Sequence, residues 1–155
     1  MLEHQQVLVS TSSAGISISF LSPENSTRLG NAQFKSTLLS QSWTVFEEDD
    51  NPLIFSLTKL NVPFANWTII DASELTVGFL YLNQLFMPSG RIYCSRTTKT
   101  SGNTIWKDES GTELANCKPL RTNAELLTFN ESQGGLPFGR MLIFADILIK
   151  QHSKH

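Results

Sequence analysis

Residues 67–94 read WTIIDASELTVGFLYLNQLFMPSGRIYC and hold the longest apolar run of the chain. Interpreted as strand, the run has apolar side chains on both faces with a two-residue period, as in a strand buried on two sides. Interpreted as helix, Asp71 and Glu74 have the spacing of a capping box, and one helix face carries Leu75, Gly78, Phe79, Leu82, Leu85 and Phe86. Both interpretations stay open from the sequence.

The segments on either side of this stretch have the pattern of short strands separated by turns. Residues 16–20 alternate apolar and polar side chains most regularly, and similar candidates are 7–9, 32–39, 43–46, 53–57, 91–96, 104–106 and 114–120. The sequence therefore predicts a mainly β fold, most simply an antiparallel β-sandwich. The alternatives are a β-barrel, or an α+β fold with one helix near residues 72–86 packed on a curved sheet.

Residues 140–149, RMLIFADILI, are apolar on both faces except at Asp146. This pattern predicts a strand at the centre of a sheet. Residues 150–155 are polar, and we expect them to be a frayed tail. With no repeat and no linker, residues 1–155 are expected to form a single β-rich domain.

Composition and charge exclude several classes of protein. The 155 residues are 40% hydrophobic and only 17% charged, with a net charge of −2. Residues 1–90 are acidic and residues 91–155 are basic, but neither half reaches the charge density of a nucleic-acid-binding surface. No apolar run is long enough for a transmembrane helix, and residues 1–4 show no signal-peptide pattern, so the chain as written carries no recognisable address.

The cysteines and histidines offer little chemistry. Cys94 and Cys117 could face each other across a hairpin as a disulfide, but two free thiols are the favoured interpretation. We expect no metal site and no cofactor, because no histidine has ligand spacing from either cysteine. All three histidines lie near the termini, so no catalytic triad or Cys–His pair is expected in the core. The sequence thus favours a role other than catalysis.

Asp146 is the candidate buried carboxylate. A carboxylate within an apolar strand requires a cation or several hydrogen-bond donors, and Arg91, Arg96 and Arg140 are the candidate partners. If it lay in a cleft, Asp146 could instead act as a general acid.

The candidate binding residues lie in two polar segments. Trp106, with Asn103 and Asp108 nearby, lies in the sequence TSGNTIWKDESG, where an exposed aromatic could stack on a sugar or enter a partner's pocket. Gly134, Gly135 and Phe138 belong to a glycine-rich loop. Trp43 and Trp67 have apolar neighbours and are predicted to lie in the core.

Three functions are compatible with this pattern. The favoured one is a non-catalytic binding or assembly module that recognises a protein or a carbohydrate through loops on a β scaffold. The second is a ligand carrier or small enzyme with a pocket around Asp146. The third is a subunit of a larger assembly such as a capsid, toxin or secretion component, for which a homo-oligomer is expected.

Overall fold

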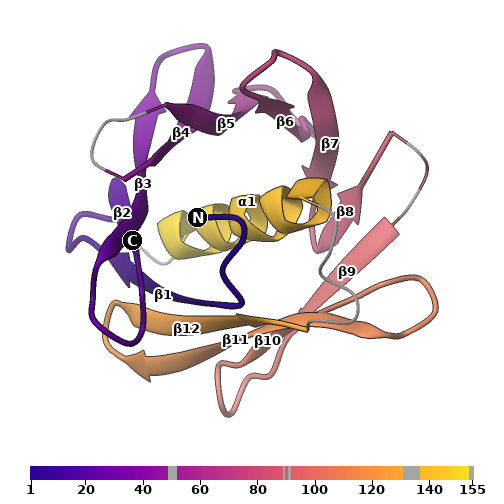
Figure 1. The fold of residues 1–155 in the computed structure, drawn as a ribbon. Coiled ribbons are helices and arrows are strands. Elements are labelled where there is room, and N and C mark those ends of the chain that lie inside the picture. Colours follow the sequence, from indigo (N-terminus) through magenta and orange to yellow (C-terminus); the bar gives the residue numbers. More distant parts are fainter. Residues whose placement is uncertain (49–51, 89, 91, 131–136, 154–155) are drawn as a thin grey trace.

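The computed structural model describes residues 1–48, 52–88, 90, 92–130 and 137–153. Among these residues, twelve strands close into a barrel, and one helix lies inside the ring of strands (Figure 1). The strands are β1 Gln6–Thr11, β2 Ser17–Leu21, β3 Arg28–Ser36, β4 Ser40–Glu47, β5 Leu53–Leu60, β6 Trp67–Asp71, β7 Thr76–Tyr81, β8 Gln84–Phe86, β9 Ile92–Thr97, β10 Thr104–Lys107, β11 Glu113–Arg121 and β12 Ala124–Phe129. The helix is α1 Pro137–Ser153.

Every strand pairs antiparallel with its neighbours in sequence, and β1 pairs with β12 to close the barrel. In this closing pair, Val7 lies opposite Leu127 and Val9 opposite Glu125. The mainly β prediction is therefore confirmed, but the sandwich is wrong and the barrel alternative is correct. Alternating apolar residues specify a strand with one buried face in either architecture. The difference is a pairing between the first and last strands, which no local pattern encodes.

The stretch 67–94 forms β6, β7 and β8 and enters β9, so the alternative helix near residues 72–86 is wrong. Asp71 and Glu74, which have capping-box spacing, form the turn between β6 and β7 instead. The Asp71 Oδ1 atom accepts from the backbone N–H groups of Ser73 at 2.9 Å and Leu75 at 3.0 Å. Glu74 has a φ of 65°. Aspartate accepts hydrogen bonds from nearby backbone N–H groups in turns as well as at helix starts. The position of Asp71 therefore did not distinguish the helix interpretation from the strand interpretation.

Residues 140–149, predicted to be a central strand, belong to α1, so that prediction is wrong. A segment that is apolar on every side suits a buried strand or a buried helix, and periodicity alone does not separate them. Here the barrel surrounds the helix, and Leu142, Phe144, Ala145 and Leu148 are all fully buried. Residues 150–153, expected to be a frayed tail, instead continue the helix to Ser153.

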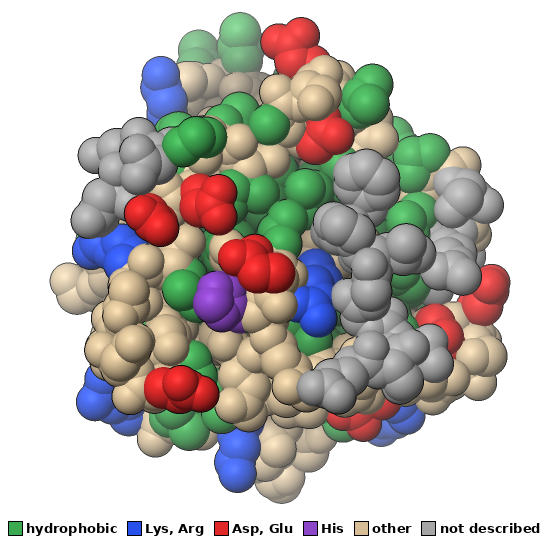
Figure 2. Space-filling view, viewed as in Figure 1, with side chains coloured by type: hydrophobic (Ala, Val, Ile, Leu, Met, Phe, Trp, Pro, Cys, Tyr) green, Lys and Arg blue, Asp and Glu red, His purple; other side chains and the backbone are tan. Residues whose placement is uncertain are grey.

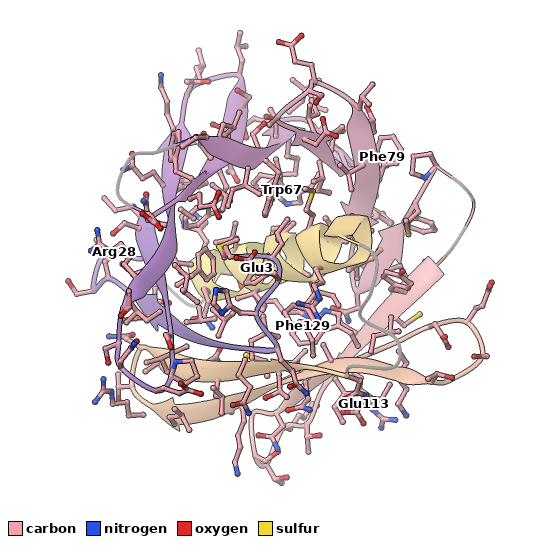
Figure 3. The ribbon with its side chains drawn as sticks, viewed as in Figure 1. Glu3, Arg28, Trp67, Phe79, Glu113 and Phe129 are labelled. Carbon is pink, nitrogen blue, oxygen red and sulfur yellow. The ribbon has the colours of Figure 1, made fainter. Side chains whose placement is uncertain are left out.

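The inner faces of the strands pack against α1. Figure 3 shows Trp67 and Phe129 pointing toward the helix, whereas Phe79 lies on the outer face. The Phe144 ring meets those of Phe20 and Phe129, with centroids 5.1 and 5.6 Å apart. Trp43 is also fully buried, so the prediction that Trp43 and Trp67 are core residues is confirmed.

The helix α1 packs closely on the wall at Gly78 in β7. A Cβ atom at this position would lie 2.3 Å from the carbonyl oxygen of Phe86 and 2.8 Å from Leu142 Cδ2. Both distances are far below van der Waals contact. Glycine therefore allows the helix to pack directly on the backbone of β7.

Arg140 holds the N-terminal segment across the end of the barrel where α1 begins. Its guanidinium donates to the carbonyl oxygens of Leu2 at 2.6 Å and His4 at 2.9 Å, and it lies 4.4 Å from the Phe129 ring centroid. Burial lowers the pKa of Arg140. In the same segment, backbone hydrogen bonding and the N-terminal ammonium lower the pKa of Glu3.

Candidate binding surface and pocket

The two ends of the barrel differ in charge. The strands alternate in direction, so the turns 12–16, 37–39, 61–66, 82–83, 98–103 and 122–123 lie at one end, where α1 also finishes. Toward this end lie the basic residues Lys35, Lys59, Arg96, Lys99, Lys118, Arg121 and Lys150. Among the described residues, the acid toward this end is Glu125, which lines a pocket beside α1. We call it the basic end.

The opposite end collects the acids. Toward it lie Glu3, Glu24, Glu47, Glu48, Asp71, Glu74, Asp108, Glu109 and Glu113, against Arg28, Lys107 and Arg140 among the described residues. Figure 2 views the molecule from this acidic end and shows red acidic side chains near the middle of the face. Because the strands alternate in direction, both halves of the sequence contribute to each end, and the charge difference between the ends is distinct from that between the halves.

The basic end also carries most of the exposed large hydrophobic side chains. They are Ile16, Leu38, Leu39, Leu60, Val62, Phe64, Leu82 and Leu120, whereas Leu53, Leu75 and Phe79 are elsewhere. Leu38 is 92% exposed and Phe64 is 86% exposed. Single exposed hydrophobic residues are ordinary, but a group of them on neighbouring turns marks an interaction surface.

Five of these side chains form what we call the apolar patch: Leu38, Leu39, Leu60, Val62 and Phe64. Hydrogen bonds from Asn61 hold the two turns of the patch together. Its Nδ2 donates to the carbonyl oxygens of Thr37 at 3.0 Å and Leu38 at 3.2 Å, and its backbone N–H donates to Leu39 at 2.8 Å. Phe64 has a φ of 62°, a conformation that is strained for an aromatic residue. The hydrogen bonds of Asn61 therefore fix the two turns of the patch relative to each other.

A pocket of about 160 Å³ lies between the last turns of α1 and the wall formed by β9 to β12. Its lining includes the polar side chains of Thr97, Thr104, Glu125, Lys150 and Gln151, with Trp106, Ile147 and Cys117 as apolar lining. Because α1 fills the rest of the lumen, this pocket is a space beside the helix and not an open barrel interior.

Asp146 lies beside the pocket and is 2% exposed, which confirms the prediction of a buried carboxylate. Its Oδ2 atom accepts from the indole Nε1 of Trp106 at 2.8 Å and from the Nζ of Lys150 at 2.7 Å. Lys150 also donates to Ser95 Oγ at 2.5 Å. Of the predicted arginine partners, Arg91 is outside the described residues. In the bonds described, a lysine one helical turn away and an indole N–H take the role expected of an arginine.

A second set of hydrogen bonds, centred on Gln151 and Glu125, joins the end of α1 to the barrel wall at the pocket. Gln151 Nε2 and the Cys117 thiol both donate to Glu125 Oε2, the thiol at 3.5 Å. Gln151 Oε1 accepts from the hydroxyl of Thr11 at 3.4 Å. Two polar side chains of the last helical turn, Lys150 and Gln151, therefore each connect α1 to the barrel wall.

The candidate binding residues of the sequence lie in different places. Trp106 has 0% exposure, so the expectation of an exposed aromatic is wrong. Asp108 binds its own turn, with Oδ1 accepting from the backbone N–H groups of Ser110 and Thr112 at 3.0 and 2.9 Å. Asn103 lies at the other end of β10, in the turn before this strand and therefore at the basic end of the barrel.

The glycine-rich loop gives no comparable site. Gly134 and Gly135 are outside the described residues, and Phe138 belongs to the first turn of α1. Cys94 and Cys117 are free thiols on β9 and β11, which are separated by β10, so no disulfide links them. The alternation of side chains places Cys117 toward the lumen and leaves Cys94 exposed.

Sequence reasoning missed the apolar patch and both Lys150 and Gln151. Signals for them existed: leucines and a phenylalanine within turn segments, and a lysine four residues after Asp146. The second signal has meaning only if residues 140–153 form a helix.

Two searches of the described residues gave no result. No helix there is long and apolar enough to cross a membrane. No group of three or more His, Cys, Asp or Glu side chains in that part of the chain could hold a metal ion. Comparison with protein-family models, curated proteins and solved structures found no match.

Proposed function

We propose that the chain is a non-catalytic binding module that docks on an acidic face of a partner protein through the apolar patch. The observation that carries the proposal is the coincidence, at one end of the barrel, of the exposed hydrophobic turns and most of the basic side chains. Apolar anchors supply affinity at an interface, while surrounding charges steer association and select the partner.

The chemistry of the patch favours a protein over a carbohydrate. Sugar recognition relies on exposed aromatic faces with polar groups around them, whereas the patch is mainly aliphatic and Trp106 is buried. Lys35 and Lys59 lie close to the patch, on β3 and β5. A partner face that carries carboxylates around an apolar hollow would match this surface.

Two substitutions test the proposal: Leu38→Asp and Phe64→Asp. Both side chains point into solvent, so the free energy of unfolding should change by less than about 0.5 kcal/mol for Leu38→Asp. Leu75→Asp is the matched control, because it adds the same charge to an exposed leucine at the acidic end. Partners are captured with each variant from extracts of the producing cells, identified, and purified for direct binding measurements.

The expected result is a purified protein that binds the wild type and Leu75→Asp with an affinity that falls as salt rises. Its affinity for Leu38→Asp and Phe64→Asp should be at least about tenfold weaker, the effect of losing one anchor of about 1.4 kcal/mol. A partner that binds all variants equally would contradict the proposal. So would self-association of the wild type that these substitutions abolish, or vesicle binding that depends on them in the absence of such a partner.

A further inference from the structure

The buried polar side chains of the barrel are not spread evenly. Among the described residues they are Thr11, Asn31, Ser95, Thr104, Asp146 and Gln151. All except Asn31 lie on or around the last two turns of α1, where they bond to one another, to Lys150 or to residues of the pocket wall. Burying polar groups stabilises a fold less than burying apolar ones. Their concentration beside a pocket is therefore typical of a ligand site.

The dimensions of the pocket limit the ligand. At about 160 Å³, the pocket has room for one six-membered ring. Trp106 and Ile147 supply apolar surface, so an inorganic ion would leave much of the lining without a matching group. A small organic molecule with one polar end and an apolar body matches a pocket that has both polar and apolar lining.

The remaining hydrogen-bond donors of the pocket, together with the basic residues around it, favour an acid. An ammonium group has three donors; those of Lys150 described here go to Asp146 and Ser95, which leaves one for a ligand. The hydroxyl groups of Thr97 and Thr104 are 2.9 Å apart and bond to each other, so this pair provides one further donor. Arg96, Lys99, Lys118 and Arg121 lie on the strands and turns around the pocket and add a positive field. Asp146 and Glu125 oppose this field, but Asp146 Oδ2 accepts from Lys150 and Trp106, and Glu125 Oε2 accepts from Gln151 and Cys117.

We propose that this pocket binds a small organic carboxylate about the size of one six-membered ring. The carboxylate accepts hydrogen bonds from Lys150 Nζ and from one hydroxyl group of the Thr97–Thr104 pair. Its apolar body lies against Trp106 and Ile147. This site is separate from the apolar patch, and either proposal can fail without the other.

Three compounds of the same shape test the charge requirement: benzoate, benzyl alcohol and benzylamine. Binding is followed by NMR through the indole Nε1–H signal of Trp106, which is assigned with a Trp106→Phe variant. We expect benzoate to shift this signal with a Kd in the millimolar range, as suits a ligand of so few atoms. Benzyl alcohol and benzylamine should bind at least about tenfold more weakly, the loss of one charge-assisted hydrogen bond.

Variants of the protein test the residues. The Thr97→Val/Thr104→Val variant should weaken benzoate binding several-fold, and the Asp146→Asn/Lys150→Met variant should weaken it about tenfold or more. The double variant is used because it removes both charges of the buried pair together. Lys107→Met, on the outer wall toward the acidic end, is the control and should bind as the wild type does.

Several outcomes would overturn the proposal. The first is that benzoate at millimolar concentration leaves the Trp106 signal unmoved. The second is that benzylamine or benzyl alcohol binds as tightly as benzoate. The third is that benzoate binds the Asp146→Asn/Lys150→Met variant with unchanged affinity. A shift confined to the indole signals of Trp43 or Trp67 would also place the ligand elsewhere.

Discussion

Replacing Lys150 by methionine should destabilise the protein strongly, although the side chain stands near the end of the last helix. The reason is Asp146, which is 2% exposed and accepts hydrogen bonds from Lys150 and Trp106. Methionine keeps the length and the apolar stem of lysine but removes the cation. The Asp146 carboxylate would then retain one described donor, the indole N–H.

The size of the effect follows from the burial of the two groups. Removing one partner of a buried ion pair typically costs about 3–5 kcal/mol. The Lys150 side chain is 24% exposed, so water can reach part of the site and reduce the loss. We therefore expect Lys150→Met to lower the free energy of unfolding by about 3 kcal/mol, the lower part of that range.

The double variant Asp146→Asn/Lys150→Met should recover much of this loss. The amide carries no charge, and its oxygen still accepts from Trp106, so the cost relative to the wild type should be about 1–1.5 kcal/mol. Asp146→Asn alone should cost about 1–2 kcal/mol, because the partly exposed ammonium can turn to water. These values imply a coupling energy of about 2.5–4 kcal/mol between the two side chains.

The assay is equilibrium unfolding in urea or guanidinium chloride, with the midpoint and the slope recorded for all four proteins. The slopes should agree, since the variants expose the same surface on unfolding. The reasoning is refuted if Lys150→Met costs less than about 1 kcal/mol, or if the double variant costs the sum of the single ones. Either result would mean that water, not Lys150, stabilises the Asp146 carboxylate.

Two further predictions concern the barrel wall. Gly78→Ala should lower the free energy of unfolding, measured by chemical denaturation, by at least about 3 kcal/mol, because its Cβ would lie 2.3 Å from the backbone oxygen of Phe86. The control is Gly139→Ala, which should cost less than about 1 kcal/mol because the nearest atom is the movable Tyr93 hydroxyl at 3.0 Å. Equal costs for the two variants would contradict the packing described. In the native protein a thiol reagent should modify the exposed Cys94 quickly and the buried Cys117 only after unfolding, so rapid modification of both would show that the pocket wall opens.

The strands were largely predictable because their signal is local. Ile18 and Phe20 alternate with serines along β2, and burial follows that alternation in the structure. Closure of the barrel was not predictable in the same way, because the pairing of Val9 with Glu125 joins the two ends of the β segment. Nothing in the sequence of β1 or β12 indicates whether the strand pairs with the other or lies at the edge of a sandwich.

The helix was missed for a different reason. Its residues are apolar on every side because a barrel encloses it, and that environment erases the one-sided pattern by which helices are recognised. The error extended to the candidate site. Asp146 was correctly predicted to be buried, but its partner was sought among arginines because Lys150, four residues away, is a neighbour only on a helix. The apolar patch was missed because hydrophobic residues were assigned to strands and not to the turns between them.

The architecture itself restricts where this protein can bind a partner. A closed barrel offers no free strand edge, so recognition by strand addition is excluded for the sheet as described. The lumen is filled by α1, so a large ligand cannot enter it. The outer wall and the two ends remain. At the acidic end, Leu53 and Leu75 are separate exposed side chains among many carboxylates. The basic end carries both the apolar patch and the pocket, and the strained Phe64 and most of the described buried polar side chains lie toward it. Features that reduce stability persist where they serve a function, and this argues for the basic end as the functional one.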